Sequence, residues 1–353
     1  RSHTLTEAQA RALADLPSPT YSRLFGVDTL LARLRGYLAR EDAHWLTAID
    51  GLGGMGKTAL AHDAVRELLR AGRFARVIWL TARQQFFAWR GIQEETTAVM
   101  TYPQLLSELW RSLGLGAFPA PNECGIERRV REALACQPTV LVMDNLETAA
   151  DIQALTAGLD RLARPTKVLL TTRHRVSAYE GVTSVTANEL PMADALAFMH
   201  YHASERNVPA AFAASPTEQQ RIVAITGGSP LAIKLVVGQM VARPLAVVLA
   251  DLAEVRAGAH DFYRFIFRHS WLHLSPHAQR LLLHMPLLDA RGTSWEELAA
   301  VSGCPVDEDF WRAVDELVVC SLLNAGATPG GRIVYSVHQL TEHFLLSDLV
   351  HLT

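Results

Sequence analysis

The sequence lacks the cysteine and histidine patterns of a disulfide-stapled or zinc-binding protein. Its four cysteines are far apart and never form a Cys-x-x-Cys pair, which favours reduced thiols in a cytosolic protein. Of the fourteen histidines, His200 and His202 are too close together to share a helix face, and His338 and His343 are five residues apart. The sequence therefore gives no support to a metal site built from histidine or cysteine.

Strong net charge and long apolar runs are also missing. The formal charge is −3, which excludes a bulk electrostatic attraction to nucleic acid or to anionic membranes. The most apolar long stretch, 231–250, is interrupted by Lys234, Arg243 and Pro244, so no transmembrane helix is expected. No signal peptide, internal repeat or low-complexity tract is recognised. We expect a cytoplasmic protein without a membrane partner.

The most informative feature present is a glycine-rich stretch, Gly-Leu-Gly-Gly-Met-Gly-Lys-Thr, at 51–58. Its glycines allow backbone N–H groups to point at phosphate oxygens, Lys57 can reach the β- and γ-phosphates, and Thr58 can offer its hydroxyl to Mg²⁺. An apolar strand at 44–49 and an amphipathic helix at 58–71 flank it, which favours a nucleotide-binding P-loop over a plain turn. The expected nucleotide contacts here are Gly51, Gly53, Gly54, Met55, Gly56, Lys57, Thr58 and Ala59.

A second apolar run, 140–143, ends in Asp144 and has the Walker B pattern. We expect Asp144 to hold Mg²⁺ together with Thr58, directly or through water, although an ordinary polar strand end is the alternative. Glu147 either orients an attacking water or is a solvated surface acid.

A third run, 168–171, leads to Arg173. An arginine there can sense the γ-phosphate through charge-assisted hydrogen bonds, and a surface arginine is the alternative. The candidate catalytic residues are therefore Lys57, Asp144 and Arg173, and the candidate metal ligands are Thr58 and Asp144.

Strand and helix patterns alternate up to about residue 187. Strands are expected at 44–49, 77–81, 140–143, 168–171 and 182–185. Helices are expected at 30–38, 58–71, 102–113, 126–136 and 152–163. Because the strands are continuous apolar runs rather than alternating ones, they predict an α/β fold whose parallel sheet is covered on both faces.

The pattern changes twice after this sheet. Helices alone are expected at 192–202, 217–224, 231–241 and 245–255. Helices at 275–288, 295–301 and 308–322, a hairpin around the turn 328–331 and a helix from His338 then suggest a winged helix. The predicted organisation is a lead-in and linker at 1–20, a P-loop nucleotide-binding domain at 21–187, a small helical domain at 188–258 and a winged-helix domain at 259–353.

The order of these motifs resembles the NB-ARC branch of the STAND ATPases, which includes apoptosome scaffolds, plant immune receptors and bacterial regulators. After the P-loop come Val-Leu-Val-Met-Asp-Asn, Leu-Thr-Thr-Arg, Gly-Gly-Ser-Pro-Leu-Ala and Val-His-Gln, in the family's order. The similarity spans about residues 25–345, and the ordered set is more specific than any single motif.

The resemblance implies contacts to the base of the nucleotide. Pro230, followed by Leu231, matches the family's Gly-x-Pro motif, whose proline packs on adenine. The same residues also satisfy a helix that starts with proline in its first turn. Phe25 and Val27 match the hydrophobic-Gly-Arg-Glu entry motif, but Val27 replaces the arginine, so a contact there is apolar or through the backbone.

The resemblance also implies a switch histidine. His338 matches the Met-His-Asp histidine, which reaches the β-phosphate of ADP and locks the closed state; a surface residue near a helix cap is the alternative. Val337 and Gln339 replace the methionine and the aspartate, so the lock is expected to be altered. Asn145 replaces a second acid of plant members, which fits slow hydrolysis.

The function implied is an ATP/ADP-dependent, Mg²⁺-dependent molecular switch with slow ATPase activity. It would be closed and monomeric with ADP, and would open and form homo-oligomers on ATP exchange. Family members act through N-terminal effector domains and sense through C-terminal repeats, and neither is in this sequence. Since it starts at Arg1 without methionine, and Arg-Ser-His looks like a cloning remnant, we expect a piece of a longer protein.

Two rival functions are a conventional turnover ATPase and a DNA-binding transcription regulator. The segment 307–316, at the place of a recognition helix, carries five acids and one arginine, a net charge of −5 + 1 = −4. Phosphate contacts need the opposite sign, so nucleic-acid binding through this chain is not expected. Its apolar members are expected in the core, namely Phe310, Trp311, Val314 and Leu317.

Overall fold

The fold is that of a computed structural model, which describes residues 6–81, 100–119, 125–146, 149–176, 179, 181–241, 243–254, 259–289, 292–328 and 330–346. The chain forms two compact units. Unit 1 comprises Arg1–Pro17, Val27–Leu52 and Gly56–Asn188; unit 2 comprises Ser18–Gly26, Gly53–Met55 and Glu189–Thr353. Each unit has its own hydrophobic core.

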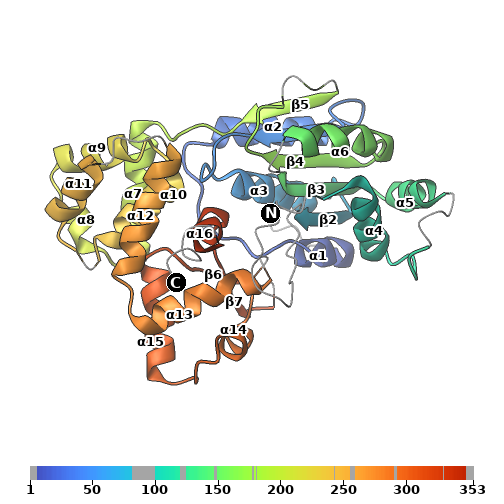
Figure 1. The fold of residues 1–353 in the computed structure, drawn as a ribbon. Helices are drawn as coiled ribbons and strands as arrows, with labels where there is room; N and C mark the ends of the chain where they lie inside the picture. Colours follow the sequence, from blue (N-terminus) through green and yellow to red (C-terminus); the bar gives the residue numbers. More distant parts are fainter. Residues whose placement is uncertain are drawn as a thin grey trace. The chain divides into compact units, whose positions relative to one another are not determined.

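Unit 1 is built on a five-stranded parallel sheet (Figure 1). The strands are β1 (Leu46–Asp50), β2 (Arg76–Thr81), β3 (Thr139–Leu146), β4 (Lys167–Thr172) and β5 (Val182–Thr186). Their order is β2-β3-β4-β1-β5, and every pairing is parallel. All residues of β1 and β4 are buried, so the expected parallel sheet with two covered faces is confirmed.

Helices cover both faces of this sheet (Figure 1). They are α1 (Glu7–Ala14), α2 (Asp28–Ala39), α3 (Lys57–Arg70), α4 (Tyr102–Ser112), α5 (Ile126–Ala135) and α6 (Ala149–Leu162). Helix α3 packs against α1 and α2, while α4, α5 and α6 pack against one another. The spacing of Leu31, Leu34 and Leu38 gives α2 one apolar face, and all three are buried.

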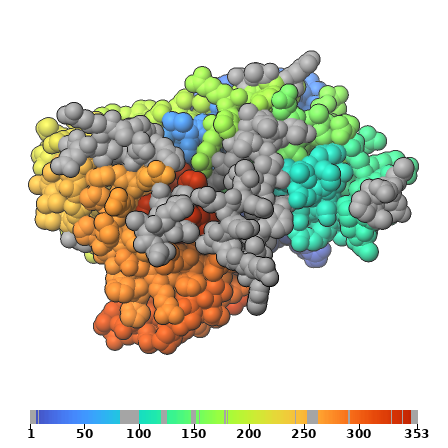
Figure 2. All heavy atoms as spheres, viewed as in Figure 1, coloured from blue at the N-terminus to red at the C-terminus, as the bar shows by residue number. Residues whose placement is uncertain are grey.

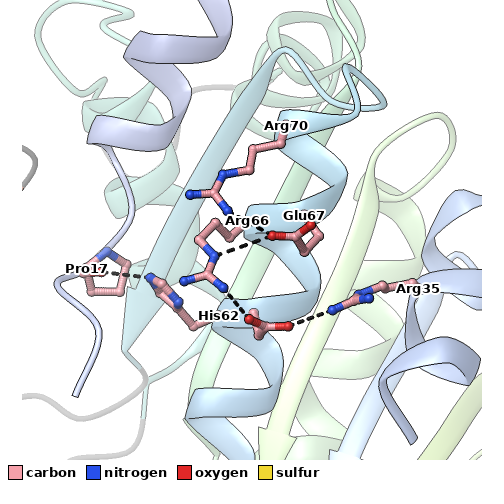
Figure 3. Close-up of polar contacts among 7 residues, drawn as sticks. Pro17, Arg35, His62, Arg66, Glu67 and Arg70 are labelled. Carbon is pink, nitrogen blue, oxygen red and sulfur yellow. Dashed lines mark hydrogen bonds and ion pairs between the residues drawn. The ribbon is translucent and has the colours of Figure 1, made fainter. Parts of the chain in front are cut away.

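The lead-in helix α1 is attached to α3 by polar contacts. The side-chain amide nitrogen of Gln9 donates to the carbonyl oxygens of Leu69 (3.4 Å) and Arg70 (3.2 Å), in the last turn of α3. His62, on α3, is hydrogen-bonded through Nε2 to the carbonyl oxygen of Pro17 at 3.0 Å (Figure 3). The segment predicted as a lead-in is therefore part of unit 1 as far as Pro17.

Unit 2 is mainly helical (Figure 1). Its helices are α7 (Met192–Glu205), α8 (Pro209–Ala213), α9 (Pro216–Ile225), α10 (Pro230–Gln239), α11 (Leu245–Glu254), α12 (Ala259–Leu272), α13 (Pro276–His284), the 3₁₀ helix η1 (Met285–Leu287), α14 (Trp295–Ser302), α15 (Glu308–Val319) and α16 (Gln339–Phe344). Strands β6 (Asn324–Ala327) and β7 (Ile333–Ser336) form the expected antiparallel hairpin. The buried hydrophobic residues of unit 2, from Ala195 to Leu345, form one core. In Figure 2 the atoms of its C-terminal part, coloured orange, form a continuous surface.

Besides the short helix α8, which was not predicted, two features of unit 2 differ from the sequence predictions. Helix α12 was not predicted, because its aromatic-rich sequence has weak helix propensity; it forms with Tyr263, Ile266 and Phe267 buried on one face. The prediction of a buried Trp311 was wrong: it is 40% exposed and its ring lies 5.8 Å from that of Trp295. Phe310, Val314 and Leu317 are buried as expected.

Among the described helices, none is both long and apolar enough to cross a membrane.

Candidate functional site

The P-loop starts at the carboxyl end of β1 and ends at the N-terminus of α3. Gly51, Gly54 and Gly56 have φ values of 141°, 81° and 80°, which residues with a side chain rarely adopt. A Cβ at Gly51 would lie 2.3 Å from the carbonyl oxygen of Ala187. Of the four predicted glycines, Gly51, Gly54 and Gly56 are therefore required by the backbone path of the loop.

Lys57 is the first residue of α3 and is buried, with 9% of its surface exposed. Its ammonium donates to the carbonyl oxygens of Gly51 (2.8 Å) and Leu52 (2.7 Å). Gly56 precedes it as the N-cap, and a glycine offers no side-chain acceptor to the first N–H groups of the helix. Those N–H groups, the helix dipole and the ammonium together form a donor set suited to phosphate.

Asp144 lies near the carboxyl end of β3 and is 4% exposed. The Thr58 hydroxyl donates to its Oδ1 at 3.0 Å and lies 3.2 Å from Oδ2. The Thr171 hydroxyl, at the end of β4, also donates to Oδ1. This arrangement brings together the two predicted metal ligands, and hydroxyl and carboxylate oxygens are the ligands that Mg²⁺ prefers.

Thr171 was not singled out from the sequence. Besides bonding Asp144, its Oγ1 accepts from the backbone N–H of Asn145 at 2.9 Å. Asn145 has φ 64°, and the register between β3 and β4 shifts between Met143 and Leu146. The sequence did show that Thr171 is a polar residue near the end of an apolar run. That it contacts Asp144 became evident only from the neighbouring positions of β3 and β4 in the sheet.

The remaining predicted residues of unit 1 lie at the same edge of the sheet. Arg173 directly follows β4 and is partly buried. Ala59 lies in the first turn of α3, and Val27 is the N-cap of α2. Close to Arg173, the Oδ2 of buried Asp50 accepts from the backbone N–H of Val176 at 3.4 Å. Glu147 lies outside the described residues.

Unit 2 contains the other predicted residues, and the loop tip Gly53–Met55 belongs to it. The Leu231 N–H donates to the Gly54 carbonyl oxygen at 3.3 Å, and the Tyr263 hydroxyl donates to that of Gly53 at 3.5 Å. Met55 is buried. A Cβ at Gly54 would lie 2.8 Å from the Tyr263 hydroxyl oxygen and 3.0 Å from Cβ of Leu231. Tyr263 was missed because α12 was not predicted.

The Gly-x-Pro motif starts α10, as its sequence suggested. Ser229 is the N-cap, Pro230 occupies the first turn, and the Ser229 hydroxyl is 2.5 Å from that of Tyr263. Burial raises the pKa of Tyr263, so this phenol stays protonated and keeps a hydrogen to donate.

Phe25 and His338 occupy separate parts of unit 2. The Phe25 ring packs against Phe198 and Tyr201 of α7, at centroid distances of 5.6 and 5.3 Å. His338 is the N-cap of α16, and its Nδ1 accepts from the Leu340 N–H at 3.1 Å. Because Nδ1 is the acceptor, Nε2 carries the hydrogen in the neutral ring.

In the part of the chain that the structure describes, no group of three or more His, Cys, Asp or Glu side chains is placed to hold a metal ion. A cation at Thr58 and Asp144 would therefore need oxygen ligands from water or from a bound phosphate.

Comparison with known proteins places this geometry in a family. Residues 27–207 match the NB-ARC domain. The chain is 23% identical over 253 residues to the probable disease resistance protein RXW24L of Arabidopsis thaliana, covering 69% of this chain and 26% of that protein. It is 27% identical over 310 residues to the regulatory protein AfsR of Streptomyces coelicolor, covering 84% and 28%. The chain thus spans about a quarter of the length of these curated relatives.

A solved structure has a similar fold. It is a signal transduction ATPase with numerous domains (STAND) from Pyrococcus horikoshii that carries a tetratricopeptide repeat sensor. The TM-score is 0.58 at 18% identity, over 94% of this chain and 44% of that one. Because the NB-ARC match covers just over half of the residues and includes the P-loop, Asp144 and Arg173, the chain belongs to the NB-ARC family.

Proposed function

We propose that the chain is the core of a nucleotide-dependent molecular switch, which binds ADP or ATP with Mg²⁺ at residues 51–59. The observation that carries this proposal is the pairing of Thr58 with Asp144 directly beside Lys57 at the N-terminus of α3. Bound Mg²⁺ would neutralise charge on the phosphate oxygens. The family of the chain and the fit of these oxygen ligands support the assignment.

Each predicted residue has a proposed role in that function. The loop N–H groups and Lys57 hold the phosphates, Thr58 and Asp144 hold the cation, and Arg173 senses the γ-phosphate. Five residues are assigned to the base and the diphosphate state: Phe25, Val27, Pro230 and Leu231 contact the base, and His338 reaches the β-phosphate. Thr171 acts through Asp144 and is a positioning residue.

The switch requires states that bind the two nucleotides differently, since a ligand shifts an equilibrium only by its differential affinity. ADP would hold a closed monomer, and ATP exchange would open it and permit homo-oligomers. The proposed modules are the nucleotide-binding domain at 21–187, the helical domain at 188–258 and a winged-helix domain at 259–353. Hydrolysis would be slow, because Asn145 supplies no second acid beside Asp144.

The proposed partners follow from the same reasoning. Effector and sensor domains of a longer protein would supply output and signal, as the length of the relatives suggests. Nucleic-acid binding through α15 is disfavoured, because Arg312 pairs with Glu308 at 2.6 Å and with Asp309 at 3.5 Å. Its charge is therefore offset within the helix.

The test is nucleotide affinity of Lys57→Ala, measured by calorimetry with ADP and Mg²⁺. Hydrogen bonds to a charged group contribute about 1.5–3 kcal/mol each, so affinity should fall about 10- to 100-fold. Arg70→Ala, at the exposed far end of α3, is the matched control and should bind normally. If Lys57→Ala and Arg70→Ala bind ADP with equal affinity, the phosphates do not bind at this loop.

A further inference from the structure

Asp50, the acid directly before the P-loop, has no role so far. It is the last residue of β1 and is buried. Its carboxylate Oδ2 accepts from the backbone N–H of Val176 at 3.4 Å, and its Oδ1 is enclosed without a hydrogen-bond partner among the described residues. A buried acid with so few hydrogen bonds costs stability, and an apolar residue would avoid that cost. The chain therefore has an acid at a place where packing alone does not need one.

The backbone of Asp50 is fixed in the sheet. Its carbonyl oxygen accepts from the Ala187 N–H at 2.7 Å, which ties the end of β1 to the residue that follows β5. The next residue, Gly51, is equally confined, because a Cβ there would lie 2.3 Å from the Ala187 carbonyl oxygen. The carboxylate of Asp50 is therefore attached to a backbone that cannot shift easily, one residue from the start of the P-loop.

The core of unit 1 brings the hydrogen-bond partner of Asp50 into place. Side chains alternate along a strand, so Asp50 lies on the same face of the sheet as Leu46 and Ala48. Both of these residues belong to the core of unit 1, and so does Val176. Burial of the Val176 side chain therefore places its backbone N–H at the end of β1, where it meets the carboxylate.

Val176 ends a short segment that carries Arg173. The segment starts at Thr172, the last residue of β4, whose hydroxyl accepts from the His174 N–H at 3.1 Å. It ends at Val176, which is held by the core and by Asp50. Because β1 and β4 are paired neighbours in the sheet, both ends of the segment are attached to adjacent strands. The backbone of Arg173 lies between these two attachments.

We propose that Asp50 is a positioning residue, which holds Arg173 at a fixed place relative to the P-loop and thereby lets the chain distinguish nucleoside triphosphate from diphosphate. The inference rests on the proposed function, in which Arg173 senses the γ-phosphate. An arginine recognises phosphate through hydrogen bonds of fixed geometry, so it discriminates only if its backbone stays within about 0.5 Å of one position. Asp50 supplies that restraint from the strand that leads into the P-loop, without touching the nucleotide.

The first measurement is amide hydrogen exchange at Val176, followed by nuclear magnetic resonance without nucleotide. Asp50→Ala removes the acceptor, so the Val176 amide should exchange about tenfold faster than in wild type. Asp50→Asn keeps an acceptor oxygen and should restore slow exchange. The Ala187 amide is the internal reference, because it bonds the backbone carbonyl of Asp50, which both variants keep. Unchanged exchange at Val176, or an equal acceleration at Ala187, would overturn the inference.

The second measurement is the affinity for ADP and for a non-hydrolysable ATP analogue, by calorimetry with Mg²⁺. Asp50→Ala should weaken binding of the analogue about tenfold and leave ADP binding unchanged, because only the γ-phosphate contact depends on Arg173. Arg173→Ala should have the same effect, and the double variant should lose no more than either single one. Asp50→Asn should bind both nucleotides as wild type does. Asp42→Ala, which removes an exposed acid before the amino end of β1, is the control and should also bind both normally.

The outcomes separate this inference from the proposed function. Equal losses of ADP and analogue affinity in Asp50→Ala, or additive losses in the double variant, would make Asp50 a general support of the fold and overturn the inference. If Arg173→Ala keeps the wild-type preference, there is no sensor to position and the inference also fails. Failure of the proposed function would instead appear as normal ADP binding by Lys57→Ala. If Asp50→Ala does not fold, Asp50→Leu takes its place in both measurements, because it removes the acceptor and leaves no cavity.

Discussion

Acid should weaken unit 1 through His62. The side chain is 4% exposed and its Nε2–H donates to the Pro17 carbonyl oxygen (Figure 3). Burial, and then the charge of Arg66, lowers the pKa of His62 from 6.5 to about 4. Between these values the unfolded chain binds a proton that the folded chain excludes, so stability is lost as the pH falls.

The magnitude follows from the two pKa values. At pH 7.5 the imidazole is neutral in both states and contributes almost nothing to the pH dependence. pH 5 lies 1.5 units below the pKa of His62 in the unfolded chain, so protonation stabilises the unfolded state there. The folded state, whose pKa is lower, gains almost nothing from protonation at this pH. The expected loss of unfolding free energy between the two pH values is about 2 kcal/mol from this residue alone.

The assay is amide hydrogen exchange on α3, which measures the opening of unit 1 apart from unit 2. The variant is His62→Gln, whose amide can still donate to Pro17 but does not titrate. His343→Gln, on an exposed position of α16, is the control. Between pH 7.5 and pH 5 the unfolding free energy of the wild type should fall by about 2 kcal/mol more than that of His62→Gln. Equal losses would show that burial does not keep His62 neutral.

Further predictions concern unit 2. His338→Ala should release a fluorescent ADP analogue faster than wild type, because the proposed contact to the β-phosphate is lost; His343→Ala should not, and an unchanged release rate would place the lock elsewhere. Gly238→Ala should lower the unfolding free energy in urea by about 1–3 kcal/mol, since its Cβ would lie 2.4 Å from the backbone oxygen of Cys320. An unchanged urea midpoint would mean that α10 and the turn at Cys320 can move apart to accommodate the added methyl group at little cost.

The fold of unit 1 was largely predictable because its signals are local. Strands β2, β3 and β4 are largely continuous apolar runs, and the observed strand ends differ from the predicted ones by only a few residues. The P-loop was equally visible because its glycines and Lys57 are adjacent in sequence, and Asp144 was visible because it directly follows the apolar run 140–143.

What could not be predicted depends on contacts between distant segments. Thr171 is separated from Asp144 by 27 residues and meets it only because β3 and β4 are neighbours in the sheet. Tyr263 acts on the Gly-x-Pro motif from a helix that the core stabilises despite weak propensity. Trp311 is the converse case: its type favours burial, but it directly follows buried Phe310 on the helix and therefore points away from the core.

The bonds from Lys57 to its own loop have a consequence for nucleotide exchange. If nucleotide binds at residues 51–59 as proposed, an arriving phosphate would take the ammonium from the carbonyl oxygens of Gly51 and Leu52, so its affinity would reflect an exchange of oxygen partners rather than a new contact. When the phosphate leaves, the same two carbonyl oxygens would again accept hydrogen bonds from the Lys57 ammonium, so the buried cation would keep its partners. In the proposed switch, release of the old nucleotide would therefore avoid the electrostatic cost of leaving a buried lysine without a partner.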